Sequence, residues 1–354
     1  MVKFRPILLL CLLCLFSGQV KCAPLWYEGI LDWPAFGVPM VNYSPETDWV
    51  FGAALQGYFK CPNQQQTSIV QVSGAWSVRN QWYVHSKGTV YFGSERTWIV
   101  NYNAGYRYYP DTYYPEGNAF VIKTGLTFHS RRAHGEFSAM ASLPADWYLG
   151  SKVHYLYEET DCSPTVSMLG MGVVACYDTR DIHFYPTKGL FFQTVLMHYE
   201  TTNRHYERMQ MASIDLRHFV PVYKNLVFAW QFRTQWTIGE DIPFQLQPAL
   251  GGEDLVRGVR AGMFRDRALV ALQGEWRIPI YRQLSGTVFA GIGDVYHYKD
   301  WQWNMPKVGY GLGLRFTINR AKVNIRADIA RNNLYKSWNT IDGYSFYLTA
   351  TEAF

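Results

Sequence analysis

Apolar and polar residues alternate most regularly in the later half of the chain, over residues 226–238, 307–318 and 321–330. In the first stretch the apolar positions are Leu226, Phe228, Trp230, Phe232, Trp236 and Ile238, and the polar positions are Gln231, Arg233, Gln235 and Thr237. Because successive side chains of a β-strand point to opposite faces, each stretch predicts a strand with one apolar and one polar face. A soluble sandwich would turn the apolar face inward, whereas a membrane barrel would turn it toward lipid.

Turn-separated runs typical of strands also fill the earlier half of the chain. They cover residues 48–60, 66–78, 80–93, 98–109, 118–129, 133–142, 148–160 and 165–178, with turn residues such as Pro115-Glu116-Gly117 between them. A last run, Tyr344–Phe354, ends on the final residue. These runs predict about sixteen antiparallel strands, since no segment after the N-terminus approaches the roughly 18 consecutive apolar residues of a transmembrane helix.

The N-terminus has the pattern of a secretory signal peptide. Lys3 and Arg5 precede an apolar run from Ile7 to Phe16, and small residues follow. We therefore expect a signal peptide over residues 1–22, a short periplasmic linker or plug over 23–38, and a barrel over 39–354. A lipoprotein cleaved before Cys22 is the alternative, which Lys21 disfavours because a small residue is needed there.

Composition decides between the two β architectures. Aromatic residues make up 17% of the chain and charged residues also only 17%, below the usual quarter for charged residues. An exported, aromatic-rich chain without long apolar runs predicts an all-β fold, a transmembrane antiparallel β-barrel in the bacterial outer membrane. Removing residues 1–22 lowers the formal charge from +5 to +2, because it removes three basic residues and no acidic one. That balance gives no reason to expect a nucleic-acid partner.

Candidate chemistry for an enzyme or a metal site is sparse. Three of the six cysteines lie in the expected signal peptide. Of the other three, Cys162 and Cys176 could form a disulfide, which leaves Cys61 as the odd cysteine, and no Cys-x-x-Cys pair supports a zinc site. His129-Ser130, or His198 with His205, could be imagined as a catalytic or metal-binding set, but single histidines in a barrel more often line the lumen. The Gly309-x-Gly311-x-Gly313 run alternates along a strand and lacks a following helix, so it is not a nucleotide loop. We expect no catalytic residue, cofactor or metal, and interpret these glycines as clearing space in the lumen.

A long loop around Leu250–Arg260 carries the most distinctive residues. Val256-Arg257-Gly258 lies at its centre between further glycines, and Glu275 and Asp294 follow at strand-like positions. Long loops with tight local geometry are often functional. We therefore predict that the loop folds into the lumen and is held there by Arg257, which lies next to Gly258 and pairs with Glu275 and Asp294. We call this contact the lock.

Four motifs in order resemble one family. They are Asn42-Tyr43-Ser44-Pro45-Glu46, the turn from Asp178 to Gly189 with Arg180, Asp181 and Pro186, the Val-Arg-Gly loop, and the stretch Val308–Arg315. Together they closely resemble the bacterial surface antigen family, the barrel domain of BamA/TamA-like outer-membrane assembly and secretion proteins. The resemblance runs from about Pro39 to Phe354. It differs in two ways: Val259 stands where an aromatic residue usually follows Arg-Gly, and the chain has no room for the periplasmic repeats of the family's larger members.

The resemblance implies a sixteen-stranded barrel whose loop arginine contacts acidic residues on later strands. It also implies insertion or translocation of polypeptides, or of lipid, at the outer membrane, in a short form without the family's periplasmic repeats. The expected partners are outer-membrane lipid and either client outer-membrane proteins or a separate periplasmic protein. A passive channel or a purely structural barrel is the alternative function.

The expected opening is a lateral seam between the first strand, near Asp48–Lys60, and the last, near Gly343–Phe354. Gly52, Gly57 and Gly343 supply no packing surface and weaken a strand. A weak seam in a closed barrel is where a strand edge can reappear and pair with a client strand.

Overall fold

The computed structural model describes most of the chain. The described residues are 23–24, 35–44, 48–62, 64, 66–94, 96–203, 206–297, 299, 306–317, 324–334, 343–349 and 352–354. The expected signal peptide, Pro45 and Glu46 of the first motif, and His205 lie outside them. No helix in the described part of the chain is long and apolar enough to cross a bilayer.

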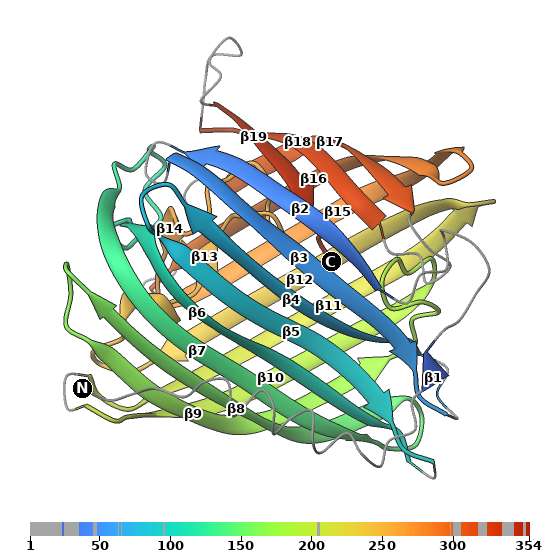
Figure 1. Ribbon diagram of the computed structural model, residues 1–354, viewed down its shortest axis with the longest axis horizontal. Coiled ribbons are helices and arrows are strands. Elements are labelled where there is room, and N and C mark those ends of the chain that lie inside the picture. The colour runs from blue at the N-terminus through green and yellow to red at the C-terminus, as the bar shows by residue number, and fades with distance from the viewer. Residues whose placement is uncertain are drawn as a thin grey trace.

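A 17-stranded antiparallel sheet makes up almost the whole structure (Figure 1). Its strands are β1 (Ala23–Pro24), β2 (Ala35–Ser44), β3 (Asp48–Lys60), β4 (Ser68–Ser77), β5 (Trp82–Phe92), β6 (Trp98–Tyr113), β7 (Leu126–Ser142), β8 (Trp147–Thr160), β9 (Val166–Asp178), β10 (Gly189–Thr201), β11 (Met209–Tyr223), β12 (Leu226–Ile238), β15 (Ala268–Tyr281), β16 (Leu284–Tyr296), β17 (Lys307–Thr317), β18 (Asn324–Asn332) and β19 (Tyr344–Thr349). Apart from the two-residue β1, this agrees with the expected count of about sixteen.

Two expected strand positions are wrong. The first long strand is β2, which begins at Ala35 inside the expected linker and precedes the strand at 48–60. The strand expected at 118–129 does not form, because β6 runs on to Tyr113 and β7 begins only at Leu126. Residues 114–125 instead form a loop, and Gly117 pairs through its backbone with Arg265.

The sheet curls round so that its first and last strands approach each other (Figure 1). Each long strand pairs with its neighbours in sequence, and β12 pairs with β15 across the long loop. Among the described residues, no ladder joins β2 to β19, so the sheet is not closed by hydrogen bonds. The polar sides of the strands face the interior, which is the barrel arrangement.

Side-chain exposure fits a barrel rather than a sandwich. On β15, Leu272 and Trp276 are 47% and 40% exposed on the outer face, whereas Glu275 between them is fully buried on the inner face. On β17, Leu312 is exposed and Arg315 is buried. Apolar residues outside and buried charges inside are the reverse of a soluble sandwich and match a lipid-facing barrel.

The connections divide into two rims. The loop rim carries the long connections, 114–125, 239–267 and 297–306, and the turn rim carries short ones such as 143–146, 224–225 and 282–283. The 239–267 loop contains η3 (Phe244–Leu246) and the short pair β13 (Ala249–Leu250) and β14 (Phe264–Arg265). Its apolar side chains pack inside the barrel against Leu269, Ala271 and Val295.

The cysteines differ from expectation. Cys162 is a free, exposed thiol and Cys176 a free, buried one, while Cys61 is disulfide-bonded. Cys162 lies beyond one end of β9 and Cys176 near the other, so about ten residues of extended strand, roughly 33 Å, separate them. A disulfide between them would require a separation below about 7 Å.

Candidate functional site

The centre of the 239–267 loop lies against the inner wall of β16 to β18. A Cβ on Gly309 of β17 would lie 2.1 Å from the Arg257 carbonyl oxygen, and one on Gly258 would lie 2.5 Å from the Arg331 carbonyl oxygen. Gly258 also has a φ of +102°. Glycine at these two positions allows the loop backbone to approach the sheet this closely.

Arg257 is the buried centre of this contact. Its guanidinium donates to Glu275 Oε2 and to Asp328 Oδ2, each at 2.7 Å, and lies 3.6 Å from the centre of the Phe289 ring. All three ionised side chains are almost fully buried. Charge-assisted hydrogen bonds in such a setting hold a loop firmly, since an unpaired charge there is costly.

The predicted contact between Arg257 and Asp294 is wrong. Asp294 accepts a hydrogen bond from Lys307 Nζ at 2.6 Å. It lies opposite Val270, whereas Phe289 lies opposite Glu275, so Asp294 is five strand residues, roughly 17 Å, from the level of the lock. Asp328 takes the second position. Alternation places Asp328 on the polar face of its strand, but nothing in the sequence specifies that it reaches Arg257.

A wider ionic network surrounds this pair. Arg315 donates to Asp328 at 2.5 Å and to Glu352 at 2.8 Å, and Arg277 donates to Glu275 at 2.8 Å. We call the inner faces of β15 to β18, which carry these groups beneath the loop, the packed wall. Glu275 and Asp328 each have more than one cationic neighbour, so the network is shared rather than a set of separate pairs.

Arg277 links the network to the turn rim. It donates to the Pro186 carbonyl at 2.8 Å and to a Phe354 oxygen at 3.3 Å, and its guanidinium stacks on Tyr185. The β9–β10 turn, residues 179–188, therefore folds inward from one rim as the long loop does from the other. Both meet side chains of β15.

Each residue singled out in that turn has a structural role. Asp178 accepts two hydrogen bonds from the Arg180 guanidinium, at 2.8 and 2.7 Å, and Arg180 stacks on Phe191. Asp181 accepts from the Thr187 amide at 2.9 Å and from its hydroxyl. Gly189 has a φ of +107°, where a Cβ would meet the Thr179 carbonyl oxygen at 2.3 Å. These contacts fix the inward bend of the turn.

His183 belongs to the same turn and was not anticipated. Its Nε2 lies 2.5 Å from the Tyr91 hydroxyl and 3.1 Å from an Arg180 nitrogen. Burial, helped by the positive charge of Arg180, lowers the pKa of His183 to about 3. Burial alone would raise the pKa of Asp181, but hydrogen bonds from Thr187 and Lys188 hold it below its ordinary value. His183 is therefore neutral at physiological pH, and the turn is closed by hydrogen bonds.

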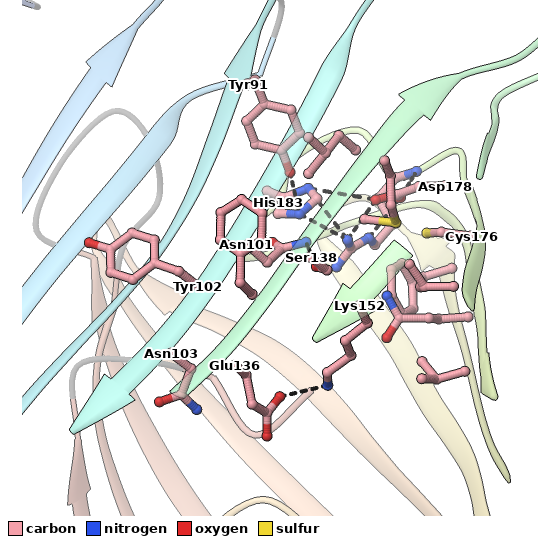
Figure 2. A pocket seen from close by; sticks show the side chains of 18 of the residues that line it. Tyr91, Asn101, Tyr102, Asn103, Glu136, Ser138, Lys152, Cys176, Asp178 and His183 are labelled. Carbon is pink, nitrogen blue, oxygen red and sulfur yellow. Dashed lines mark hydrogen bonds and ion pairs between the residues drawn. The ribbon is translucent and has the colours of Figure 1, made fainter. Parts of the chain in front are cut away.

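The inner faces of β5 to β8 form what we call the open wall. Asn103, Glu136 and Lys152 line a cavity of about 370 Å³, and Glu136 and Lys152 pair at 2.6 Å. Figure 2 shows these side chains and the pair between Glu136 and Lys152. Both side chains of this pair remain partly exposed. A second cavity of about 300 Å³ shares Arg180, His183 and Arg217 with the first. The β9–β10 turn thus separates two polar cavities of the lumen.

The seam residues are only partly where they were expected. Gly52 and Gly57 lie on β3, which pairs with β2 on one side and β4 on the other, so they are inside the sheet. Phe354 is not in a strand; its ring packs against Phe219 in the interior, 6.5 Å between ring centres. Gly343 directly precedes β19, which pairs with β18 over only six residues, Tyr344–Thr349.

The lock and the last strand are in direct contact. The Gly258 amide donates to the Tyr347 hydroxyl of β19 at 3.1 Å, and Asn332 of β18 donates to the Gly258 carbonyl at 2.6 Å. Arg326 of β18 donates to Thr349 of β19 at 3.1 Å.

Among the described residues, no group of three or more His, Cys, Asp or Glu side chains could hold a metal ion.

Comparison with known proteins agrees with this architecture. A family model described as the Omp85 superfamily domain matches residues 68–354. The crystal structure of BamA from Haemophilus ducreyi lacking POTRA domains 1–3 has a TM-score of 0.55 and 11% identity, covering 94% of this chain and 74% of that one. CdiB from Acinetobacter baumannii has a TM-score of 0.55 and 10% identity, covering 88% and 58%, and CdiB from Escherichia coli has 0.55 and 12%, covering 93% and 66%. The chain thus spans less than two thirds of either CdiB structure. No curated protein matches this sequence.

Proposed function

Because this chain belongs to the Omp85 superfamily, we propose that it inserts or translocates polypeptides through a lateral seam between β2 and β19. The protein is an integral outer-membrane β-barrel, as this family is. In such barrels the longer loops face the outside and the short turns face the periplasm. The loop rim is then extracellular, and the turn rim is the side from which a client polypeptide would arrive.

The observation that carries the proposal is the contact between the locked loop and the edge strand. β19 has a short ladder with β18 and, among the described residues, none with β2. Its Tyr347 hydroxyl is held by the Gly258 amide next to Arg257. An unpaired strand edge presents backbone donors and acceptors that a client strand of any sequence can use. The loop would hold β19 in place while the lock is intact.

The contents of the lumen favour this lateral route over a straight one. The long loop fills one end, and the β9–β10 turn with residues 352–354 fills the other. That turn divides the cavity along the open wall, about 370 Å³, from the second cavity of about 300 Å³. A polypeptide would have to displace both plugs to pass through the lumen, whereas the seam needs only the edge strands to part.

Engineered disulfides test the seam directly. In a Cys162→Ser background, cysteines at Ala35 or Gly37 of β2 would be combined with cysteines at Phe346 or Leu348 of β19. The matched control is Val84→Cys with Tyr106→Cys, a directly paired and outward-facing pair across the continuous β5–β6 junction. We expect oxidation of the seam pair, but not of the control pair, to deplete the outer-membrane proteome of cells that depend on this protein. An unchanged proteome with a fully crosslinked seam would overturn the proposal.

A passive channel is the second candidate, and the two polar cavities of the lumen favour it. Ion conductance through the reconstituted protein separates the two functions. A channel conducts steadily whether the seam is crosslinked or reduced, and it leaves client insertion unaffected in both states. A seam-dependent insertase loses insertion on crosslinking, whatever its basal conductance.

A further inference from the structure

Two neighbouring hairpins on the turn rim repeat one sequence pattern. Residues 221–226 read Pro-Val-Tyr-Lys-Asn-Leu, and residues 279–284 read Pro-Ile-Tyr-Arg-Gln-Leu. The first connects β11 to β12 and the second β15 to β16. Because β12 pairs directly with β15, the two hairpins lie side by side, roughly 10 Å apart at the usual strand spacing.

A β-bulge in each hairpin turns an extra side chain outward. The register shifts between Pro221 and Tyr223, and again between Pro279 and Tyr281. Each tyrosine then lies opposite an outward-facing leucine. Val222 and Tyr223 are 52% and 66% exposed, and Ile280 and Tyr281 are 56% and 65% exposed. Proline suits a bulge because it has no amide to leave unpaired, and bulges commonly re-aim a side chain.

The next residue in each hairpin is a long base in a left-handed backbone conformation. Lys224 has a φ of 49° and Arg282 a φ of 47°, a region that glycine or asparagine adopts more readily. The cationic end of each lies 5.1 Å from the ring of its own preceding tyrosine. Among the described residues, neither base has a carboxylate within 4 Å. Both charges are thus exposed without an acidic partner, directly beyond the apolar outer wall.

We propose that these twin hairpins bind the headgroup phosphates of anionic phospholipids in the leaflet at the turn rim. Along each hairpin the side chains run from aliphatic to aromatic to basic, which matches the order of acyl chain, interface and phosphate across a leaflet. Basic residues next to a membrane attract anionic lipid at short range. The aliphatic and tyrosine side chains face the barrel exterior, where acyl chains lie, so lipid fits this surface better than an acidic soluble protein does.

Another described turn of the same rim lacks this pattern. The turn between β7 and β8 has Ala145 and Asp146 directly before its second strand, where the twin hairpins have the base followed by Asn225 or Gln283. An acidic turn repels the same headgroups. Anionic lipid would therefore gather beside β11 to β16, on the flank that leads to the β19 edge of the seam, rather than beside β7 and β8.

Lipid selectivity in reconstituted membranes tests this assignment. The full barrel would be placed in phosphatidylcholine bilayers containing spin-labelled phosphatidylglycerol, with Lys224→Gln, Arg282→Gln and the double variant compared. Arg208→Gln, a matched loss of an exposed base on the loop rim, is the control. We expect the preference for phosphatidylglycerol over phosphatidylcholine to fall about fivefold for each hairpin variant and not for the control. Lys224→Arg with Arg282→Lys should keep it.

The outcomes are distinct. Heat-dependent gel mobility first establishes that each variant is a folded barrel. An unchanged phosphatidylglycerol preference in the folded double variant would overturn the proposal. A variant that keeps its lipid preference but loses binding of a poly-glutamate probe would instead assign the surface to an acidic protein, and would also overturn it. Retention of the preference at high salt in the wild type would show that charge is not the cause.

Discussion

The packed wall and the open wall are built from the same alternating strands, yet their charges are in different surroundings. On the packed wall, Glu275, Asp328 and Arg315 have no exposed side-chain surface. Arg257 of the 239–267 loop contacts the two carboxylates, and Glu352 contacts Arg315. On the open wall, Glu136 and Lys152 keep 34% and 23% of their side-chain surface. How much a lumen-facing charge contributes to the free energy of unfolding therefore depends on what covers it. The residue type alone does not decide this.

The position of each wall suits the proposed function. The packed wall includes β18, the neighbour of the edge strand, and its loop contacts β19 through Tyr347. The open wall lies on the other side of the lumen, among strands that are paired on both sides. Firm ionic packing is thus concentrated beside the strand that has to be held and released.

The largest effect is expected for Arg257→Ala. Breaking a fully buried pair costs roughly 3–5 kcal/mol, and the lower end, about 3 kcal/mol, applies here because Arg277 and Arg315 still contact Glu275 and Asp328. The free energy of unfolding in urea and the protease sensitivity of the 239–267 loop measure it. In double-mutant cycles, Arg257→Ala should couple to Asp328→Asn and be additive with Asp294→Asn. Coupling to Asp294→Asn instead would place the lock elsewhere.

Gly309→Ala should act through shape alone. The added Cβ would lie 2.1 Å from the Arg257 carbonyl oxygen, so the loop must move away. Overpacking of this kind costs about 1–3 kcal/mol. We expect faster proteolysis of the loop, while Gly135→Ala on β7, which has open space within 4 Å of its Cβ position, should change nothing. Equal effects of the two substitutions would show that strand propensity rather than loop seating is responsible.

The contacts of Arg257 also show how much of the site can be predicted from the sequence. Alternation predicts that Glu275 and Asp328 face the lumen, and the loop glycines predict close backbone approach near Arg257. The choice of Asp328 over Asp294 depends on the register across β16, β17 and β18, which local pattern does not encode. The sequence pattern does not predict strand β2, because Gly37 and Pro39 are more typical of a linker than of a strand. The terminal strand run predicts Phe354 in the seam. Its contacts with Phe219 and Arg277 are made by residues far away in the sequence, so local pattern does not predict them.

Docking of the β9–β10 turn should depend on pH through His183. Its pKa is about 3 in the folded state, against about 6.5 when exposed. Above pH 6.5 both states are neutral and docking is complete. Between pH 6.5 and 3 only the released turn takes up a proton, so docking weakens as pH falls, by at most about 1.4 kcal/mol per pH unit. An environment-sensitive dye at Lys188→Cys, in a Cys162→Ser background, reports release. His183→Gln should remove the dependence, and its persistence would assign the titration to another group.

The smallest effect is expected on the open wall, where Lys152→Met removes one partner of the Glu136 pair. The pair is close, at 2.6 Å, but both side chains meet the lumen, so water can solvate the carboxylate that is left. Partly exposed pairs are worth about 0–1 kcal/mol. Arg277→Met, the matched change on the packed wall, removes a cation from a carboxylate that water does not reach, and it also frees the Pro186 carbonyl. If the two substitutions lowered the free energy of unfolding equally, burial under the loop would not explain the difference between the walls. The two carboxylates would then be equally hydrated.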